Sequence, residues 1–173
     1  MSANTTLPHV TKNDLYAKLV QLGIEKGYVV IPEFRVKLPD DQRKRDRKKN
    51  IDLVWVTRKR EITSPHQNCE SLNYWTLHAT FEIDACDVRN IKGKEFDRHL
   101  RDLPSIVNIS PNEPIRHFVV LYNAAYDRAW NNARKTTDAE IEQRRGWAAR
   151  TNSGVHIIDG RDLKVIDNLP VVT

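Results

Sequence analysis

Strict alternation of apolar and polar residues sets residues 74–86 apart from the rest of the chain. The apolar positions lie two residues apart: Trp75, Leu77, Ala79, Phe81 and Ile83. The positions between them are polar: Thr76, His78, Thr80, Glu82 and Asp84. Successive side chains of a strand point to opposite faces of a sheet. The alternation therefore predicts a strand with one apolar face against the core and one polar face.

The pattern elsewhere predicts a regular order of elements. Leucines at helical spacing, with Ile24 after them, indicate a first helix that is capped by Thr11 or Asn13 and ends at Gly27. Further strands are expected over 28–36, 51–56, 115–122 and 154–158, and helices over 94–103 and 123–150, the second of these divided near Thr137. The tail, residues 163–172, can add an edge strand. This order predicts an α/β fold, with a central mixed β-sheet flanked by helices on both faces.

Size and composition favour a single intracellular domain. The 173 residues suit one domain, with residues 1–10 as a loose lead-in. The two cysteines are far apart in sequence, so neither a zinc knuckle nor a disulfide framework is expected. No apolar run is long enough to cross a membrane, and the first residues lack a signal-peptide pattern. We therefore expect a soluble cytoplasmic protein. Its net charge of +5 favours nucleic acid or another polyanion as partner.

A concentration of positive charge precedes the second predicted strand. We interpret residues 40–50 as a basic loop, and its cations are Arg43, Lys44, Arg45, Arg47, Lys48 and Lys49. These residues are the best candidates for contacts with nucleic-acid phosphates. The alternative is a solvated loop without a ligand.

Three acids are expected to meet at one end of the sheet. Asp52 lies at the start of the second strand, and Glu82 and Asp84 lie near the end of the third. If these strands are antiparallel neighbours, the start of one lies beside the end of the other. Carboxylate oxygens of this kind suit Mg²⁺, with water and a substrate phosphate as further ligands. The alternative is that Glu82 and Asp84 are ordinary surface acids.

These features together resemble the PD-(D/E)xK nuclease superfamily. The core of that family is helix, three strands, helix, strand, and the matching segments here are Asn50–Val54 and Phe81–Asp84, within residues 14–122. The resemblance implies a restriction endonuclease-like core and a metal-dependent endonuclease that hydrolyses DNA. It also implies Asp52, Glu82 and Asp84 as the catalytic and metal-binding acids, Mg²⁺ or Mn²⁺ as the cofactor, and a homodimer that cuts both strands.

One position departs from the family pattern, because Asp84 stands where the family has lysine. A displaced cation could take over the catalytic role of that lysine, Lys92 first, then Arg89 or Lys94. The resemblance also suggests a fourth metal-binding acid, for which Glu33 is preferred over Asp14. The alternative function is a catalytically inactive domain of this fold that binds nucleic acid or protein. A third hypothesis is an interaction or immunity-type factor whose acids are surface features.

Other polar residues receive weaker interpretations. His78 and Thr80 share the predicted polar face with Glu82, so His78 could contact the site, although a bystander role is the commoner one. The remaining histidines have no metal-ligand spacing, and no role is assigned to His66, His99, His117 or His156. A late helix offers a second contact surface through Arg144, Arg145 and Arg150, while Trp147 is expected to pack against the core or a partner subunit.

Overall fold

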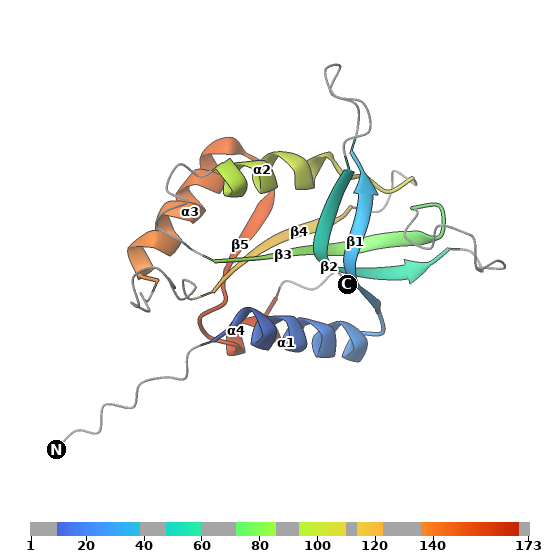
Figure 1. The fold of residues 1–173 in the computed structure, drawn as a ribbon, viewed down its shortest axis with the longest axis horizontal. Coiled ribbons are helices and arrows are strands. Elements are labelled where there is room, and N and C mark those ends of the chain that lie inside the picture. The colour runs from blue at the N-terminus through green and yellow to red at the C-terminus, as the bar shows by residue number, and fades with distance from the viewer. Residues whose placement is uncertain are drawn as a thin grey trace, which may run out of the picture.

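Five strands form one mixed sheet in the order β1-β2-β3-β4-β5 (Figure 1). The computed structural model describes residues 10–38, 48–59, 72–85, 94–109, 114–122 and 136–169. The strands are β1 Val29–Lys37, β2 Lys48–Arg58, β3 Trp75–Ala85, β4 Arg116–Tyr122 and β5 Val155–Asp159. The pairs β1–β2 and β2–β3 are antiparallel, whereas β3–β4 and β4–β5 are parallel. The predicted mixed sheet, with a central parallel strand at residues 115–122, is confirmed.

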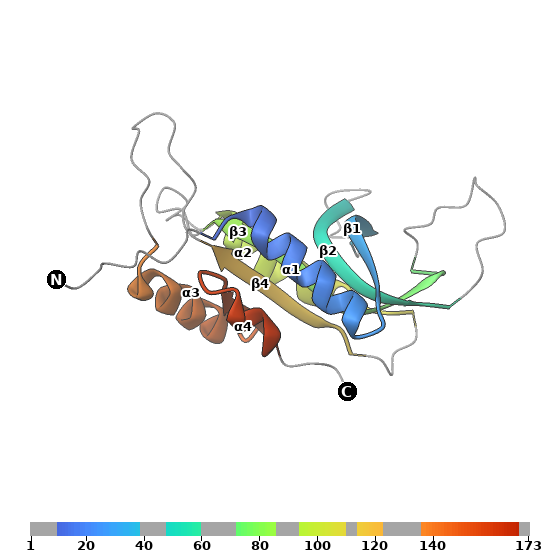
Figure 2. The ribbon, with the colours of Figure 1, turned by 90° about the horizontal axis from the view of Figure 1, so that it is seen from below.

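Helices cover both faces of this sheet, as predicted. One face carries α1 Lys12–Glu25 and α4 Lys164–Asp167; the other carries α2 Lys94–Asp102, followed by the short helix η2 Leu103–Ser105, and α3 Asp138–Thr151 (Figures 1 and 2). Each face has its own core: Phe81 and Phe118 pack on the α1 side, and Phe34 and Val119 on the α2 side. In the described part of the chain, no helix is sufficiently long and apolar to cross a membrane.

The helix starts follow from local hydrogen bonding. Thr11 caps α1 and Thr137 caps α3, each in a capping box with an acid three residues later. At the other end of α1 the C-cap is Lys26, and Gly27 follows it with a left-handed φ of 83°. Ile24 is 62% exposed and does not belong to the buried face of α1.

Two expectations for the last part of the chain are wrong. The tail does not add a strand over its described residues, because α4 forms there and buries Ile166 completely. Arg144 does not lie on a free contact surface, because its guanidinium is buried 4.9 Å from the centre of the Phe96 ring and 5.9 Å from that of Trp147. Trp147 packs against the core, as expected.

A β-bulge breaks the alternation of β3. Val56 pairs with Leu77 and Trp55 pairs with Ala79, so His78 is an extra residue on its strand. Trp75 and Leu77 therefore lie in the core on the α2 side, while Ala79, Phe81 and Ile83 lie in the core on the α1 side. The predicted single apolar face is wrong for this reason.

The bulge also separates His78 from Glu82. The imidazole of His78 lies 2.7 Å from the Thr57 hydroxyl and packs against the Tyr28 ring, which borders the core on the α1 side. His78 thus has the structural role of a bystander, and it does not share a face with Glu82.

A buried histidine elsewhere in the sheet predicts sensitivity to acid. His117 Nδ1 lies 2.8 Å from the Thr80 hydroxyl, and burial, with a smaller effect of His156, lowers the pKa of His117 from 6.5 to about 4. A histidine whose folded pKa is depressed contributes stability above its unfolded pKa and loses that contribution as pH falls. Between pH 6.5 and 4, we expect the free energy of unfolding to fall by about 3 kcal/mol more in the wild type than in His117→Gln. Urea denaturation across this pH range measures the difference, and parallel curves for the two proteins would contradict it.

Candidate functional site

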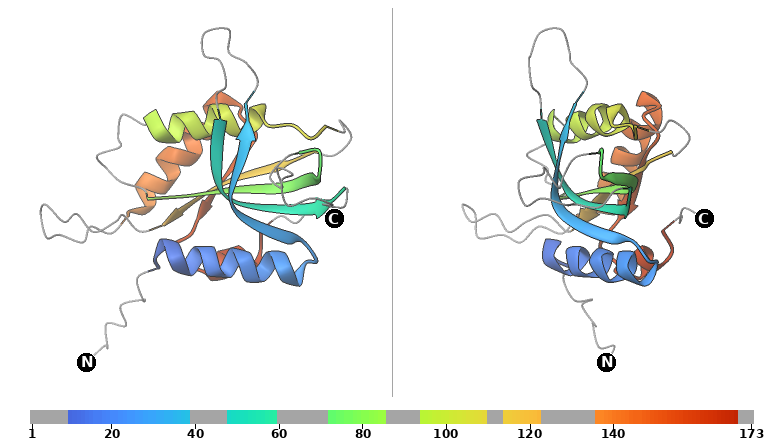
Figure 3. Two further views of the ribbon diagram at one scale, coloured as in Figure 1. Left: turned by 45° about the vertical axis from the view of Figure 1, so that its right-hand side comes forward. Right: turned by 90° about the vertical axis from the view of Figure 1, so that its right-hand side faces the viewer.

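A polar cavity of about 330 Å³ lies where the start of β2, the end of β3 and α2 meet. The paired ends of β1 and β2 rise beside α2, which brings these elements together (Figure 3). The cavity is lined by charged and polar side chains: Lys48, Lys49, Asn50, Asp52, Glu82, Arg98, His99 and Asp102. Two of the three predicted acids, Asp52 and Glu82, are thus in one cavity. Its volume is near the lower end of those that hold small ligands.

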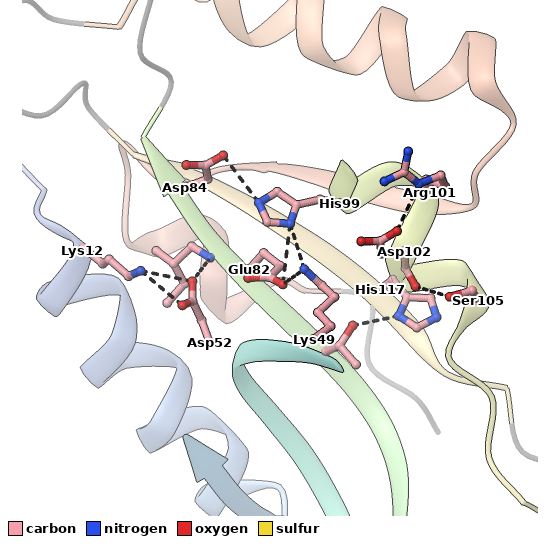
Figure 4. Close-up of polar contacts among 12 residues, drawn as sticks. Lys12, Lys49, Asp52, Glu82, Asp84, His99, Arg101, Asp102, Ser105 and His117 are labelled. Atoms are coloured by element: carbon pink, nitrogen blue, oxygen red, sulfur yellow. Dashed lines mark hydrogen bonds and ion pairs between the residues drawn. The ribbon is translucent and has the colours of Figure 1, made fainter. Parts of the chain in front are cut away.

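Asp52 lies against the end of β3, as the antiparallel pairing predicts. Its Oδ2 atom accepts a hydrogen bond of 2.8 Å from the backbone N–H of Ile83, the residue between Glu82 and Asp84 (Figure 4). The same carboxylate binds the ammonium of Lys12 on α1 at 3.2 and 3.3 Å. Burial is the largest single effect and lowers the pKa of Lys12, but the charge and hydrogen bond of Asp52, together with the charges of Tyr122 and Glu33, raise the pKa above its ordinary value. Lys12 therefore stays charged and neutralises Asp52.

Glu82 is buried in an ion pair with Lys49. Their side chains are 6% and 9% exposed, and Lys49 Nζ lies 2.6 Å from Glu82 Oε1. Apart from this ion-pair contact, the buried Oε1 atom has no hydrogen-bond partner within the described residues. Burial raises the pKa of Glu82 to about 7, although the charge of Lys49 favours the ionised form. Glu82 can therefore exchange a proton near neutral pH.

His99 on α2 lies between two of the acids. Its Nδ1 atom is 3.2 Å from Lys49 Nζ and 3.6 Å from Glu82 Oε1, and its Nε2 atom is 3.8 Å from Asp84 Oδ2 (Figure 4). Burial and the nearby Lys49 charge lower the pKa of His99 to about 3, so the ring is neutral at pH 7. Because an ammonium only donates, Nδ1 accepts and the ring hydrogen lies on Nε2, facing Asp84.

Lys49, which was predicted in a loop, and His99, which had no assigned role, both lie at the site. Lys49 was expected in a loop, but β2 begins at Lys48, so the predicted loop 40–50 is wrong for its last three residues. Strand alternation places Lys49 on the side of the buried Ile51, and this signal could have identified it. His99 had no assigned role, although it follows Phe96 by three positions on the buried side of α2.

Glu33, the predicted fourth metal-binding acid, does not line the cavity. Glu33 is exposed, with a left-handed φ of 49°, and lies on β1 across from Asp52. Its charge acts on Lys12, whose pKa it helps to raise, rather than on Glu82. Five cations fall outside the described residues: Arg43, Lys44, Arg45, Arg47 and Lys92. Arg89 and the side chain of Lys94 fall outside them too.

Sequence reasoning also missed Lys12 and Tyr122. Tyr122 ends β4 beside the end of β3. Burial raises the pKa of its phenol, and the charges of Asp84 and Asp52 add to this, whereas Lys12 opposes it. Both residues approach the acids from elements distant in sequence, so no local motif indicates them.

Comparisons of the chain with protein-family models, curated proteins and solved structures give no match. The resemblance to PD-(D/E)xK nucleases therefore stays a prediction from short motifs and element order.

The oxygen atoms at the cavity are of the type that binds a hard metal ion. Asp52 and Glu82 supply carboxylate oxygens, one of them buried without a hydrogen bond, which suits a hard cation such as Mg²⁺. As now arranged, the described residues contain no group of three or more His, Cys, Asp or Glu side chains that could hold a metal ion. Each of the two carboxylates is paired with a lysine instead. The chemistry of the donors fits a hard cation, and in this structure two lysines neutralise the two carboxylates.

Proposed function

We propose that the protein is a metal-dependent endonuclease that hydrolyses DNA phosphodiester bonds. Asp52 and Glu82 would hold Mg²⁺ or Mn²⁺, with Asp84 beside them. The main support is the position of the Asp52 carboxylate, which is hydrogen-bonded to the backbone between Glu82 and Asp84 and lines one cavity with Glu82. The element order from α1 to β4, helix, three strands, helix, strand, is that of the PD-(D/E)xK core and supports the same proposal.

Under this proposal, Glu82 and Lys49 have chemical roles beside the bound cation. A bound divalent cation would supply an activated water and shield charge on the phosphate. Glu82 would bind the cation through its carboxylate, and its pKa of about 7, raised by burial in the absence of metal, indicates a site that favours neutralisation of this charge. Lys49 joins Lys92, which lies outside the described residues, as a candidate for the displaced lysine, because its ammonium lies at the cavity and could stabilise negative charge on a phosphate once a cation has taken its place at Glu82.

Basic residues at the cavity would hold the DNA backbone. Lys48 is exposed at the start of β2, and Arg98 lines the same cavity from α2. The cations of the preceding segment, Arg43, Lys44, Arg45 and Arg47, remain candidates for phosphate contacts on sequence grounds.

The second candidate function is a DNA- or protein-binding domain without catalysis. The observation that favours it is the pairing of both cavity carboxylates with lysines, which leaves the described residues without an assembled metal group. Asp84, at the position where PD-(D/E)xK nucleases have lysine, also favours a domain without catalysis.

Cleavage of a supercoiled plasmid separates the two functions. With Mg²⁺ or Mn²⁺ we expect nicked and linear products from the wild-type protein, and with EDTA we expect none. DNA binding that weakens with salt, without cleavage in any metal, would favour the binding domain. A protein that neither binds nor cleaves DNA would contradict the nuclease and the DNA-binding domain, and it would leave the protein-binding domain.

A further inference from the structure

Two lysines already occupy the positions next to the cavity acids that a cation needs. Lys49 reaches Glu82 from β2, and Lys12 reaches Asp52 from α1 (Figure 4). The Lys49–Glu82 pair is the more enclosed, because its side chains are 9% and 6% exposed while those of Lys12 and Asp52 are 45% and 19% exposed. Screening by water therefore weakens the Lys12–Asp52 pair more than the Lys49–Glu82 pair.

Lys49 and a divalent cation cannot both contact the Oε1 atom of Glu82 in the present arrangement. Mg²⁺ binds carboxylate oxygens at about 2.0–2.1 Å. The Lys49 ammonium is 2.6 Å from Oε1, so an ion bound to that oxygen would lie close to a second positive charge. In a desolvated site this repulsion is much stronger than in water. Binding of the metal to Oε1 therefore requires the ammonium to move away.

The surroundings allow Lys49 to move. Its four-carbon stem is flexible, and its ammonium already lies 3.2 Å from His99 Nδ1. This neutral nitrogen can keep one hydrogen bond to Lys49 after the carboxylate is lost. The Oε1 atom of Glu82, which accepts no hydrogen bond from the described residues, is correspondingly suited to a stronger ligand.

We propose that Lys49 is a displaceable counter-ion of Glu82, which holds the carboxylate until a divalent cation takes its place. The inference rests on the proposed function, since it concerns the same metal site. It explains why acids suited to a metal form no assembled metal group here. It also means that Lys49 opposes metal binding, whereas a metal ligand or a supporting residue would favour it.

Calorimetric titration with Mn²⁺ at pH 8 tests the proposal without measuring activity. Titrations in two buffers of different ionisation enthalpy give the number of protons that metal binding releases, so that affinities for ionised Glu82 are compared. We expect Lys49→Met to bind Mn²⁺ at least about tenfold more tightly than the wild type, because the competing charge is gone. Lys26→Met, an exposed lysine at the far end of α1, is the matched control and should bind like the wild type. Glu82→Gln should lose binding in either background.

Wild-type protein gives a second readout that does not depend on a stable variant. The side-chain NH₃⁺ signal of Lys49 should shift in NMR spectra during titration with diamagnetic Mg²⁺, and it should not shift in Glu82→Gln. Equal or weaker Mn²⁺ binding by folded Lys49→Met, or an unmoved Lys49 signal in wild type that binds Mg²⁺, would overturn the inference and leave the nuclease proposal intact. Tighter binding without DNA cleavage would support the inference and contradict the nuclease. No Mn²⁺ binding by any of these proteins would contradict both.

Discussion

Glu82→Gln and Asp52→Asn are each expected to reduce the rate of metal-dependent plasmid nicking by at least ~100-fold. Both substitutions keep the size of the side chain and remove its negative charge. Glu82 would lose the negative charge that binds the metal, and Asp52 would lose its charge while the amide oxygen can still accept from Ile83. Removing a residue that only supports a metal ligand commonly costs 10–100-fold, so removing a ligand should cost at least the upper part of that range.

The matched control is Asp97→Asn, because Asp97 is an exposed acid on α2, the helix that carries His99. Its nicking rate should stay within about twofold of the wild-type rate, as is usual for a surface substitution. Circular dichroism before each assay establishes that the variants are folded. Nicking by folded Glu82→Gln at more than a tenth of the wild-type rate would remove Glu82 from the proposed active site.

Lys49→Met is expected to lower the free energy of unfolding at pH 8, without metal, by about 3–5 kcal/mol. The methionine keeps most of the apolar stem and removes the ammonium, which leaves the Glu82 carboxylate buried without its counter-charge. Breaking a buried ion pair by removing one partner costs more than the pair contributes, because the remaining charge has lost its solvation. Denaturation by urea measures the difference.

The pH dependence of this loss identifies its cause. The pKa of Glu82 is raised to about 7 even beside Lys49, and the loss of Lys49 should raise it further. An acid whose folded pKa is raised takes up a proton on folding, so stability falls as pH rises from its unfolded value through the folded one. The destabilisation by Lys49→Met should therefore be larger at pH 8 than at pH 6. An equal loss at both values would indicate lost packing of the stem.

A double variant separates charge from packing. Replacing both partners, in Lys49→Met with Glu82→Met, should recover most of the stability that the single substitution loses, because a buried ion pair is often equivalent to apolar residues of similar volume. The coupling energy from the wild type, the two single variants and the double variant then gives the contribution of the Lys49–Glu82 interaction to stability.

Elements that depend on local pattern were predictable from the sequence. The caps at Thr11 and Thr137 follow from residues three positions apart. The meeting of Asp52 with the end of β3 follows from antiparallel pairing, which aligns strand starts with strand ends. The mixed sheet likewise follows from the order of strands and helices.

Features that depend on distant contacts were not predictable in this way. The bulge at His78 arises from pairing with β2, and no residue within β3 indicates it. Lys49 looks like one cation of a basic run until its partner Glu82, far away in sequence, is known. His99 and Lys12 reach the acids from different helices, so only the folded chain brings them together.

The most direct measurement of the central claim, that Asp52 and Glu82 share one cation site, is anomalous diffraction from crystals soaked in Mn²⁺. The account predicts an anomalous peak in the cavity between β2, β3 and α2, within ligand distance of an oxygen of Asp52 and an oxygen of Glu82, with the Lys49 ammonium moved away from Glu82. A Lys49–Glu82 pair that stays closed at saturating Mn²⁺, with no peak between the two carboxylates, would contradict it.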